Sequence, residues 1–332
     1  MRYLLLGMMT LWMFSGCERL SMDNEVTIYV SEDQVFSEPL LKAFEKKTGI
    51  KVNAIYDTEE SKGTGVMNRL IAESNNPQAD LYWANEPIRA EVLRQKGILA
   101  PYKSPNAEGI PEKFKDPKGY WTGFSARVRI FVVHKDLAQK PTGVMDYLHP
   151  KYQGRSIIAN PLFGTTTIHM AALYSLLGKE KLMEFLKGLK ENKVAISTGN
   201  GESADLVSKG EYGFALVDSD DAVVRLRRGE VISLVYPDQE EGEMGALVIP
   251  NAVMLMKNAR HPKAAKKLID YLLSSKTEAK LAQADCAQIP LHAGVTPPKE
   301  IKALNEIRIM QVDYAKLASF MLEIQPILRQ IF

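Results

Sequence analysis

Two short polar stretches carry the residues best suited to hold a small charged solute. The first, Gly164 to Thr167, opens a predicted helix directly after a strand and a Pro/Gly loop. Backbone N–H groups and hydroxyls converge there beside the positive end of the helix, which suits an anion. Threonine at a helix start is also an ordinary N-cap. The stretch by itself leaves an anion site and a structural cap open.

The second stretch is acidic and follows another predicted strand. Asp218, Asp220 and Asp221 place three carboxylates within four residues. They repel one another unless a cation or hydrogen-bond donors neutralise them, and hard cations prefer oxygen ligands. A metal ion or the hydroxyls of a polyol would meet that need. In the alternative, Asp218 or Ser219 caps the following helix, and the other acids favour its positive end.

Other charged residues are equally ambiguous. Glu86 precedes Pro87, so it is either a first-turn acid or a ligand contact. Arg127 and Arg129 lie two residues apart on one predicted strand, hence on the same face. They and Lys62 are solvated charges, unless one of them reaches a cleft and pairs with a phosphate or carboxylate.

No pattern predicts a catalytic centre. The five histidines are scattered, and no H-x-x-x-H or C-x-x-C pair is present. Cys286 is the only cysteine beyond Cys17, and its surroundings suggest a buried apolar residue. The histidines of the chain are His134, His149, His169, His261 and His292.

Composition indicates a soluble globular protein large enough for two domains. The chain has 332 residues, of which 45% are hydrophobic and 25% charged. A formal net charge of +2 gives no electrostatic reason to expect nucleic acid or an anionic membrane surface as partner. A charged solute must therefore be bound by charged residues close to it and not by the net charge of the protein.

The N-terminus resembles a bacterial lipoprotein signal. Arg2 precedes an apolar run that is too short to span a bilayer, and Ser15-Gly16-Cys17 offers a cleavage point. We expect residues 1–16 to be removed, Cys17 to carry lipid, and residues 17–25 to form a tether. A secretory signal that is cut elsewhere is the alternative, and both imply export.

Strands and helices alternate through most of the chain, which predicts parallel sheets covered by helices and an α/β fold. In such sheets, ligands bind outside the carboxyl ends of the strands. Two long strands, at 121–134 and 245–257, interrupt the rhythm and suit crossings between two lobes. We expect a last helix near 302–331. The predicted strands are 26–31, 50–56, 79–86, 155–159, 193–197 and 212–217.

Several segments together resemble the periplasmic solute-binding proteins of ABC importers. They are VTIYVSEDQ, FEKKTGIKV, NPQADLYWANEP, SARVRIFVVH, NPLFGTTT, EYGFALVDSDDA and AQIPLHAGV, and the resemblance runs from about Val26 to Pro298. The similarity is greatest to the branch of the ferric-iron-binding proteins and their phosphonate- and hexose-phosphate-binding relatives.

The resemblance implies a type II periplasmic-binding-protein-like fold with a hinge of two long crossing strands. Lobe 1 would comprise residues 26–125 and 248–288, and lobe 2 residues 126–247 and 289–332. In ferric-binding members, two adjacent tyrosines coordinate iron, helped by a His or acid near the first strand and by a Glu. Here the tyrosine pair is replaced by Asp218 to Asp221, while Asp33 and Glu86 suit the other two positions.

In the resemblance, the anion-binding loop corresponds to Gly164, Thr165 and Thr166, with Asn200 as a further candidate. Thr167, Ser61, Lys62 and Arg127 complete the predicted anion-binding set on the grounds of their position and charge. The preferred function is capture of ferric iron, with phosphate or carbonate as co-ligand, on Asp33, Glu86, Asp218, Asp220 and Asp221. The alternative solute is an organic phosphate or phosphonate. The expected partner is an ABC permease in the inner membrane. We expect the protein itself to be a monomer without enzymatic activity, held by a lipid anchor in the periplasm or at the cell surface.

Two other classes of function stay open. Some transferases and a thiamine-degrading enzyme use two-lobed relatives of this fold, and Cys286 would have to be the nucleophile. A sensor that presents the bound solute to a signalling partner would have the same sequence features as a transport protein.

Overall fold

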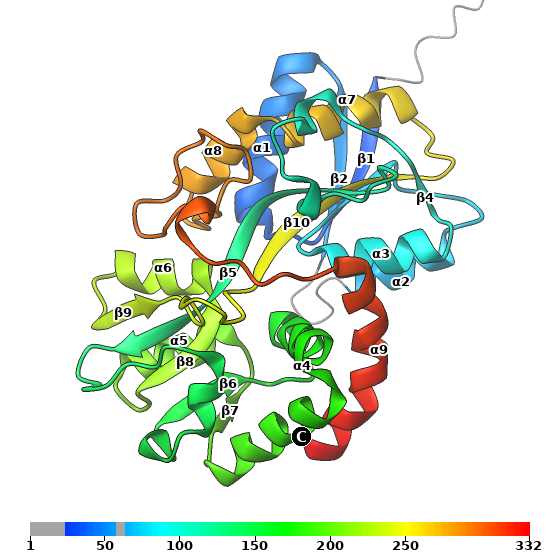
Figure 1. Cartoon of the computed structure of the whole chain (residues 1–332). Helices are drawn as coiled ribbons and strands as arrows, with labels where there is room; N and C mark the ends of the chain where they lie inside the picture. The colour runs from blue at the N-terminus through cyan, green and yellow to red at the C-terminus, as the bar shows by residue number, and fades with distance from the viewer. Residues whose placement is uncertain (1–23, 58–63) are drawn as a thin grey trace, which may run out of the picture.

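The computed structural model describes residues 24–57 and 64–332. One mixed sheet runs through the molecule, with strand order β2-β1-β3-β10-β5-β8-β6-β7. The strands at one end of this order belong to lobe 1 and those at the other end to lobe 2, and β10 and β5 lie between them (Figure 1). None of the helices in the described part has the length and hydrophobicity that a membrane-spanning helix needs.

Lobe 1 is built on three parallel strands, β1 (Glu25–Val30), β2 (Lys51–Tyr56) and β3 (Leu81–Ala84). The helices that follow them are α1 (Gln34–Thr48), α2 (Thr64–Ala72) and α3 (Pro87–Gln95). α1 ends at Gly49, whose φ of 73° is a left-handed conformation that glycine adopts without strain. The predicted β–α alternation is confirmed here.

Lobe 2 repeats the arrangement with the parallel strands β6 (Ser156–Ala159), β7 (Ala195–Ser197) and β8 (Phe214–Asp218). Their helices are α4 (Gly164–Glu191), α5 (Asn200–Ser208) and α6 (Ser219–Arg227), and β9 (Ile232–Val235) pairs with β5. α4 is interrupted at Gly178, where φ is 82°, so it consists of two helices that meet there.

The two long strands join the lobes. β5 (Thr122–His134) pairs with β8, β10 (Val248–Met256) pairs with β3, and the two pair with each other. The short β4 (Leu99–Ala100) also pairs with β10. A third segment joins them after α8, because Ala126 and Ile289 exchange two backbone hydrogen bonds of 2.7 Å.

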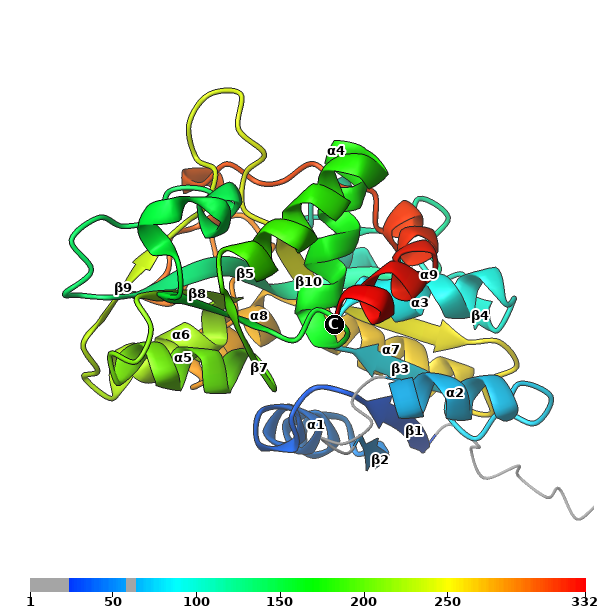
Figure 2. The ribbon, with the colours of Figure 1, turned by 90° about the horizontal axis from the view of Figure 1, so that it is seen from below.

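The C-terminal helices pack on both lobes. α7 (Pro262–Leu272) and α8 (Ser275–Gln283) cover lobe 1, whereas α9 (Tyr314–Ile331) packs against both α3 and α4. Figure 2 shows α9 beside α4, on the side of the sheet opposite to α1. The prediction that this helix starts near 302 was wrong, because Asp313 caps it by accepting hydrogen bonds from the N–H groups of Ala315 and Lys316. The residue boundaries of the two lobes stay a prediction.

Candidate functional site

The carboxyl ends of β6, β7 and β8 meet at one edge of lobe 2. Because these strands are parallel, the first residues of α4, α5 and α6 come together there. Thr165, Asn200 and Asp218, which are far apart in the sequence, are therefore within hydrogen-bond distance of one another. This edge is the candidate site.

Arg129, which lies on β5, binds several side chains of this edge. It is completely buried on β5, and its Nη1 donates to Thr165 Oγ1 at 3.1 Å, Asn200 Oδ1 at 2.9 Å and Asp218 Oδ1 at 3.0 Å. Its Nη2 donates to Thr166 Oγ1 at 3.2 Å and to the Leu216 carbonyl at 3.1 Å. One guanidinium thus fixes four of the side chains.

Asp218 is neutralised within this network. Its second oxygen, Oδ2, accepts hydrogen bonds from the Thr165 hydroxyl at 2.9 Å and from Asn200 Nδ2 at 3.2 Å. Asp218 occupies the N-cap position of α6, yet its carboxylate makes no capping hydrogen bond to that helix. The carboxylate serves the site instead of the helix end.

The start of α4 is open to a ligand. Its N-cap residue is Phe163, which has no side-chain oxygen, and Gly164 adopts a positive φ of 62°. No group in the described part of the chain accepts a hydrogen bond from the backbone N–H of Gly164, Thr165 or Thr166. These groups can face an anion. Thr167 does not share this role in the structure, because its hydroxyl donates to the Pro161 carbonyl at 2.8 Å.

The predicted acidic cluster is formed. Ligand oxygens of Asp218, Asp220 and Asp221 all lie within 4.8 Å of one another. Burial chiefly raises the pKa of Asp220 to about 6, with a contribution from Asp218 and an opposing one from Arg127. Burial and then the charges of Asp220 and Asp218 raise the pKa of Asp221 well above its usual value. Both shifts favour the protonated, neutral form of these two carboxyl groups.

Arg127 connects this cluster to lobe 1. It is buried on β5, donates to the Asn85 carbonyl, and lies 3.6 Å from the Glu32 carboxylate. Burial by itself would lower the pKa of Arg127, but Asp220, Glu32 and Asp218 outweigh it and raise that pKa. Asp33 acts in the same direction more weakly. Arg127 therefore lies between acidic residues of lobe 1 and acidic residues of lobe 2.

Glu86 has a structural role. Its carboxylate accepts hydrogen bonds from the N–H groups of Ile88 and Arg89 at the start of α3, and it also binds the Arg89 guanidinium. The side chain is 2% exposed. The sequence left a first-turn acid and a ligand contact open, and Glu86 is the N-cap directly before the first turn of α3. A metal-binding role for Glu86 stays a prediction.

Among the buried polar atoms that lack a hydrogen-bond partner in the described residues are Nε of Arg127, Nε of Arg129 and Oδ1 of Asn85. Leaving such atoms unpaired costs free energy, and a ligand can supply the missing partners. Two of them are cationic donors that suit an anion, whereas the third is an acceptor that suits a hydroxyl or ammonium group.

The predicted anion-binding set contains Arg127 but not Arg129, Glu32 or Asn85. The two-residue spacing of the arginines had already marked Arg129 as a charge that could reach a cleft. Ser61, Lys62 and Cys17 lie outside the described residues.

Two features away from this edge offer less chemistry. A cavity of about 390 Å³ between the segments 109–114 and 289–309 has no acidic residue in its lining, and its walls are mostly apolar. Cys286 is 2% exposed, and burial raises the pKa of its thiol, which disfavours the reactive thiolate. The polar edge of lobe 2 is the better candidate for a charged solute.

Comparison with known proteins identifies the family of this chain. A model of the bacterial extracellular solute-binding protein family matches residues 86–319. "Iron uptake protein A1" of Synechocystis sp. is 28% identical over 86% of this chain and 81% of its own length. The "Putative 2-aminoethylphosphonate-binding periplasmic protein" of Salmonella typhimurium is 27% identical over 84% of this chain and 82% of its own length.

A solved structure shows the fold. The iron-bound HitA protein of Pseudomonas aeruginosa superimposes with a TM-score of 0.80 at 24% identity, covering 92% of this chain and 99% of that one. The chain thus has the two-lobed type II periplasmic-binding fold, as predicted from its sequence.

Proposed function

The chain belongs to the family of bacterial extracellular solute-binding proteins, and from this premise we propose that it captures a small organic phosphonate or phosphate. The solute lies between the lobes, with its anionic group at the start of α4. Lobe closure around it then presents it to an ABC importer. This reverses the preference for ferric iron drawn from the sequence.

The observation that carries the proposal is the neutralisation of Asp218. Arg129, Thr165 and Asn200 already satisfy its carboxylate, so it is a poor ligand for a bare Fe³⁺ ion. The same edge offers open N–H groups on α4 and two buried arginines with an unpaired Nε–H. These donors favour the oxygens of a phosphoryl group.

The remaining acids suit the other end of such a solute. Asp220 and Asp221 lie close to Asp218 in surroundings that oppose their ionisation, which a bound cation would offset, and the buried Asn85 Oδ1 needs a donor. An ammonium or hydroxyl group would satisfy both. A solute with a phosphonate at one end and an amine at the other, as the name of the Salmonella relative describes, matches this division of charge.

Ferric iron is the second candidate. The cluster of three aspartates supplies oxygen ligands within 4.8 Å of one another, and the Synechocystis relative is named for iron uptake. A metal would be held by Asp220 and Asp221, with Asp218 and lobe-1 acids nearby, and with a phosphate or carbonate at the start of α4.

Calorimetric titration separates the two candidates. We expect 2-aminoethylphosphonate or a sugar phosphate to bind with micromolar or tighter affinity, and ferric citrate to bind no better than citrate. Thr165→Val should weaken the binding by about 10-fold, because it removes the hydroxyl that donates to Asp218 and accepts from Arg129 and so disturbs the start of α4, where the anionic group binds.

The matched control is Thr296→Val, which alters an exposed threonine outside the site. It should leave the affinity unchanged. Binding of ferric iron alone, abolished by Asp220→Asn and unaffected by Thr165→Val, would replace the proposal with the second candidate.

We also propose that the protein is anchored on the outer side of the cytoplasmic membrane, or at the cell surface, by lipid on Cys17. Cys17→Ser should abolish incorporation of labelled fatty acid and release the protein into the soluble fraction, while the affinity for solute stays the same. Labelling that persists in this variant would disprove the anchor.

A further inference from the structure

A chain of buried polar side chains leads from the candidate site to the segments that join the lobes. Its central member is Gln288, which is completely buried in the segment after α8. Its Nε2 donates a hydrogen bond of 3.0 Å to Oε1 of Glu32, which follows β1. These two residues are 256 positions apart in the sequence, so only the fold brings them together.

The other end of the Gln288 amide is held by the two crossing strands. Its Oε1 accepts a hydrogen bond of 2.8 Å from Nδ2 of Asn251 on β10. The same Nδ2 donates to the Ser125 carbonyl on β5, also at 2.8 Å. Since Ile289 pairs with Ala126 on β5, the side chain of Gln288 is fixed at the point where all three joining segments meet.

Glu32 passes this constraint on to Arg127. Its Oε2 lies 3.6 Å from Arg127 Nη1, and Glu32 and Arg127 are 6% and 7% exposed. A buried carboxylate and guanidinium keep a fixed geometry only when further hydrogen bonds orient them. Gln288 supplies such a bond to Glu32, and the Asn85 carbonyl accepts one from Arg127.

We infer that Gln288 is a positioning residue for solute binding, acting through Glu32 on Arg127. The inference rests on the proposed function in that Arg127 is taken to face the anionic group of the solute. When a phosphoryl group engages Arg127, it competes with Glu32 for the guanidinium. Gln288 then keeps a donor on the Glu32 carboxylate and holds it in place, so the affinity depends on a residue that does not touch the solute.

The substitution Gln288→Glu tests this with little change in shape. It keeps an acceptor for Asn251 but removes the donor to Glu32 and sets two carboxylates against each other. We expect 2-aminoethylphosphonate to bind at least 10-fold more weakly. Adding Glu32→Gln restores a donor–acceptor pair in the opposite direction, and most of the affinity should return.

A matched control is Gln239→Glu, which makes the same change in charge. Gln239 accepts a hydrogen bond from the Arg308 N–H and donates to two carbonyls in lobe 2, away from this chain of contacts. Its affinity for 2-aminoethylphosphonate should equal that of the unaltered protein.

A readout that needs no solute is the Nε–H resonance of arginine in protein labelled with ¹⁵N-arginine. Gln288→Glu should shift the Arg127 resonance and leave that of Arg129 in place, because Arg129 is bound to Thr165, Thr166, Asn200 and Asp218 instead. If Gln288→Glu does not fold, Gln288→Met removes the same donor and should shift the same resonance.

The outcomes separate this inference from the proposed function. An unchanged Arg127 resonance together with unchanged affinity would overturn the role of Gln288. If the unaltered protein binds neither a phosphonate nor a sugar phosphate, the proposed function fails. A shift of Arg127 in Gln288→Glu that Glu32→Gln reverses would in that case still establish that Gln288 positions Arg127 through Glu32.

Discussion

Arg129 is the residue on which the lobe-2 edge depends most. Its guanidinium is completely buried and is the only cation bound to Asp218 by a salt bridge in the described part of the chain. Removing one partner of a buried ion pair leaves the other charge uncompensated. The side chain therefore stabilises the lobe and shapes the anion site together.

Arg129→Met should lower the free energy of unfolding by about 3–5 kcal/mol, because Asp218 is then buried without a counter-charge. Adding Asp218→Asn removes that charge and should recover part of the loss. Urea denaturation followed by circular dichroism measures both. Arg329→Met, at an exposed position of α9, is the control and should change the stability by less than about 0.5 kcal/mol. An equally small effect of Arg129→Met would contradict this account.

Only some residues of the candidate site could be predicted from the sequence. Asp218, Thr165 and Asn200 were foreseen because each stands at the junction of a strand and a helix, which sequence patterns locate well. The partner of a buried charge depends on tertiary contacts, so the link from Arg129 to Asp218 could not be read from spacing. For the same reason, nothing distinguished Thr167, whose hydroxyl turns to Pro161, from its two neighbours.

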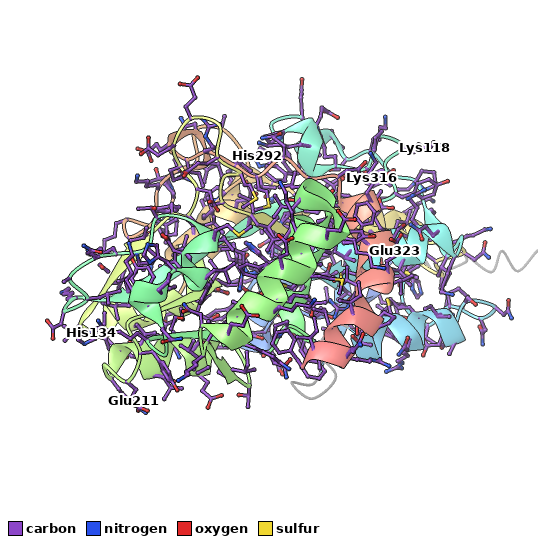
Figure 3. The ribbon with its side chains drawn as sticks, turned by 60° about the horizontal axis from the view of Figure 1, so that its bottom comes forward. Lys118, His134, Glu211, His292, Lys316 and Glu323 are labelled. Carbon is purple, nitrogen blue, oxygen red and sulfur yellow. The ribbon has the colours of Figure 1, made fainter. Side chains whose placement is uncertain are left out.

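α8 holds the joining segments through one side chain, Glu278. This completely buried carboxylate accepts hydrogen bonds from the N–H groups of Ser125, Leu291 and His292, at 2.7–2.9 Å. It also bonds to the His292 ring, whose pKa is raised chiefly by that hydrogen bond and further by the Glu278 charge. Figure 3 shows His292 away from His134 and Glu211 of lobe 2.

This contact gives the stability a pH dependence of known sign. The folded pKa of His292 lies above its unfolded value of 6.5, so protonated His292 stabilises the fold fully below pH 6.5. That contribution is lost as the pH rises through the folded pKa. Urea midpoints at pH 6, 7 and 8 should therefore fall with rising pH, and His292→Gln should flatten the fall. An identical slope in this variant would exclude His292 as the cause.

The presence of strands and helices was predicted better than the residues at which they begin and end. The strands and helices with a clear apolar period appear where expected, whereas β9 and α8 were missed and the last helix was started too early. Its start depends on the cap at Asp313 and on packing against two lobes, which leave only a weak local signal.

At the scale of the whole molecule, α9 spans the two lobes on one side of the hinge. Its first residues lie near lobe 1, where the Tyr314 hydroxyl donates to the Val248 carbonyl, and Glu323 accepts a hydrogen bond of 3.0 Å from Tyr174 on α4 (Figure 3). α4 begins at the anion site and also packs on α9. Any closure that moves α4 must therefore be accommodated by α9.

The two-lobed fold was predictable because alternating β–α units and two long strands have few compact arrangements. The identity of the solute was not, because it depends on how acids and arginines neutralise one another after folding. The tyrosine pair of the ferric-binding branch is missing from the sequence, and only the structure shows Arg129 compensating the aspartate found in its place.

The most direct test of the account is a crystal structure of the protein grown with equimolar 2-aminoethylphosphonate and ferric citrate. We predict closed lobes, with phosphonate oxygens accepting hydrogen bonds from the N–H groups of Gly164 to Thr166 and with the amine beside Asp220 and Asp221. A ferric ion coordinated by Asp220 and Asp221, with no phosphonate at the start of α4, would contradict the central claim.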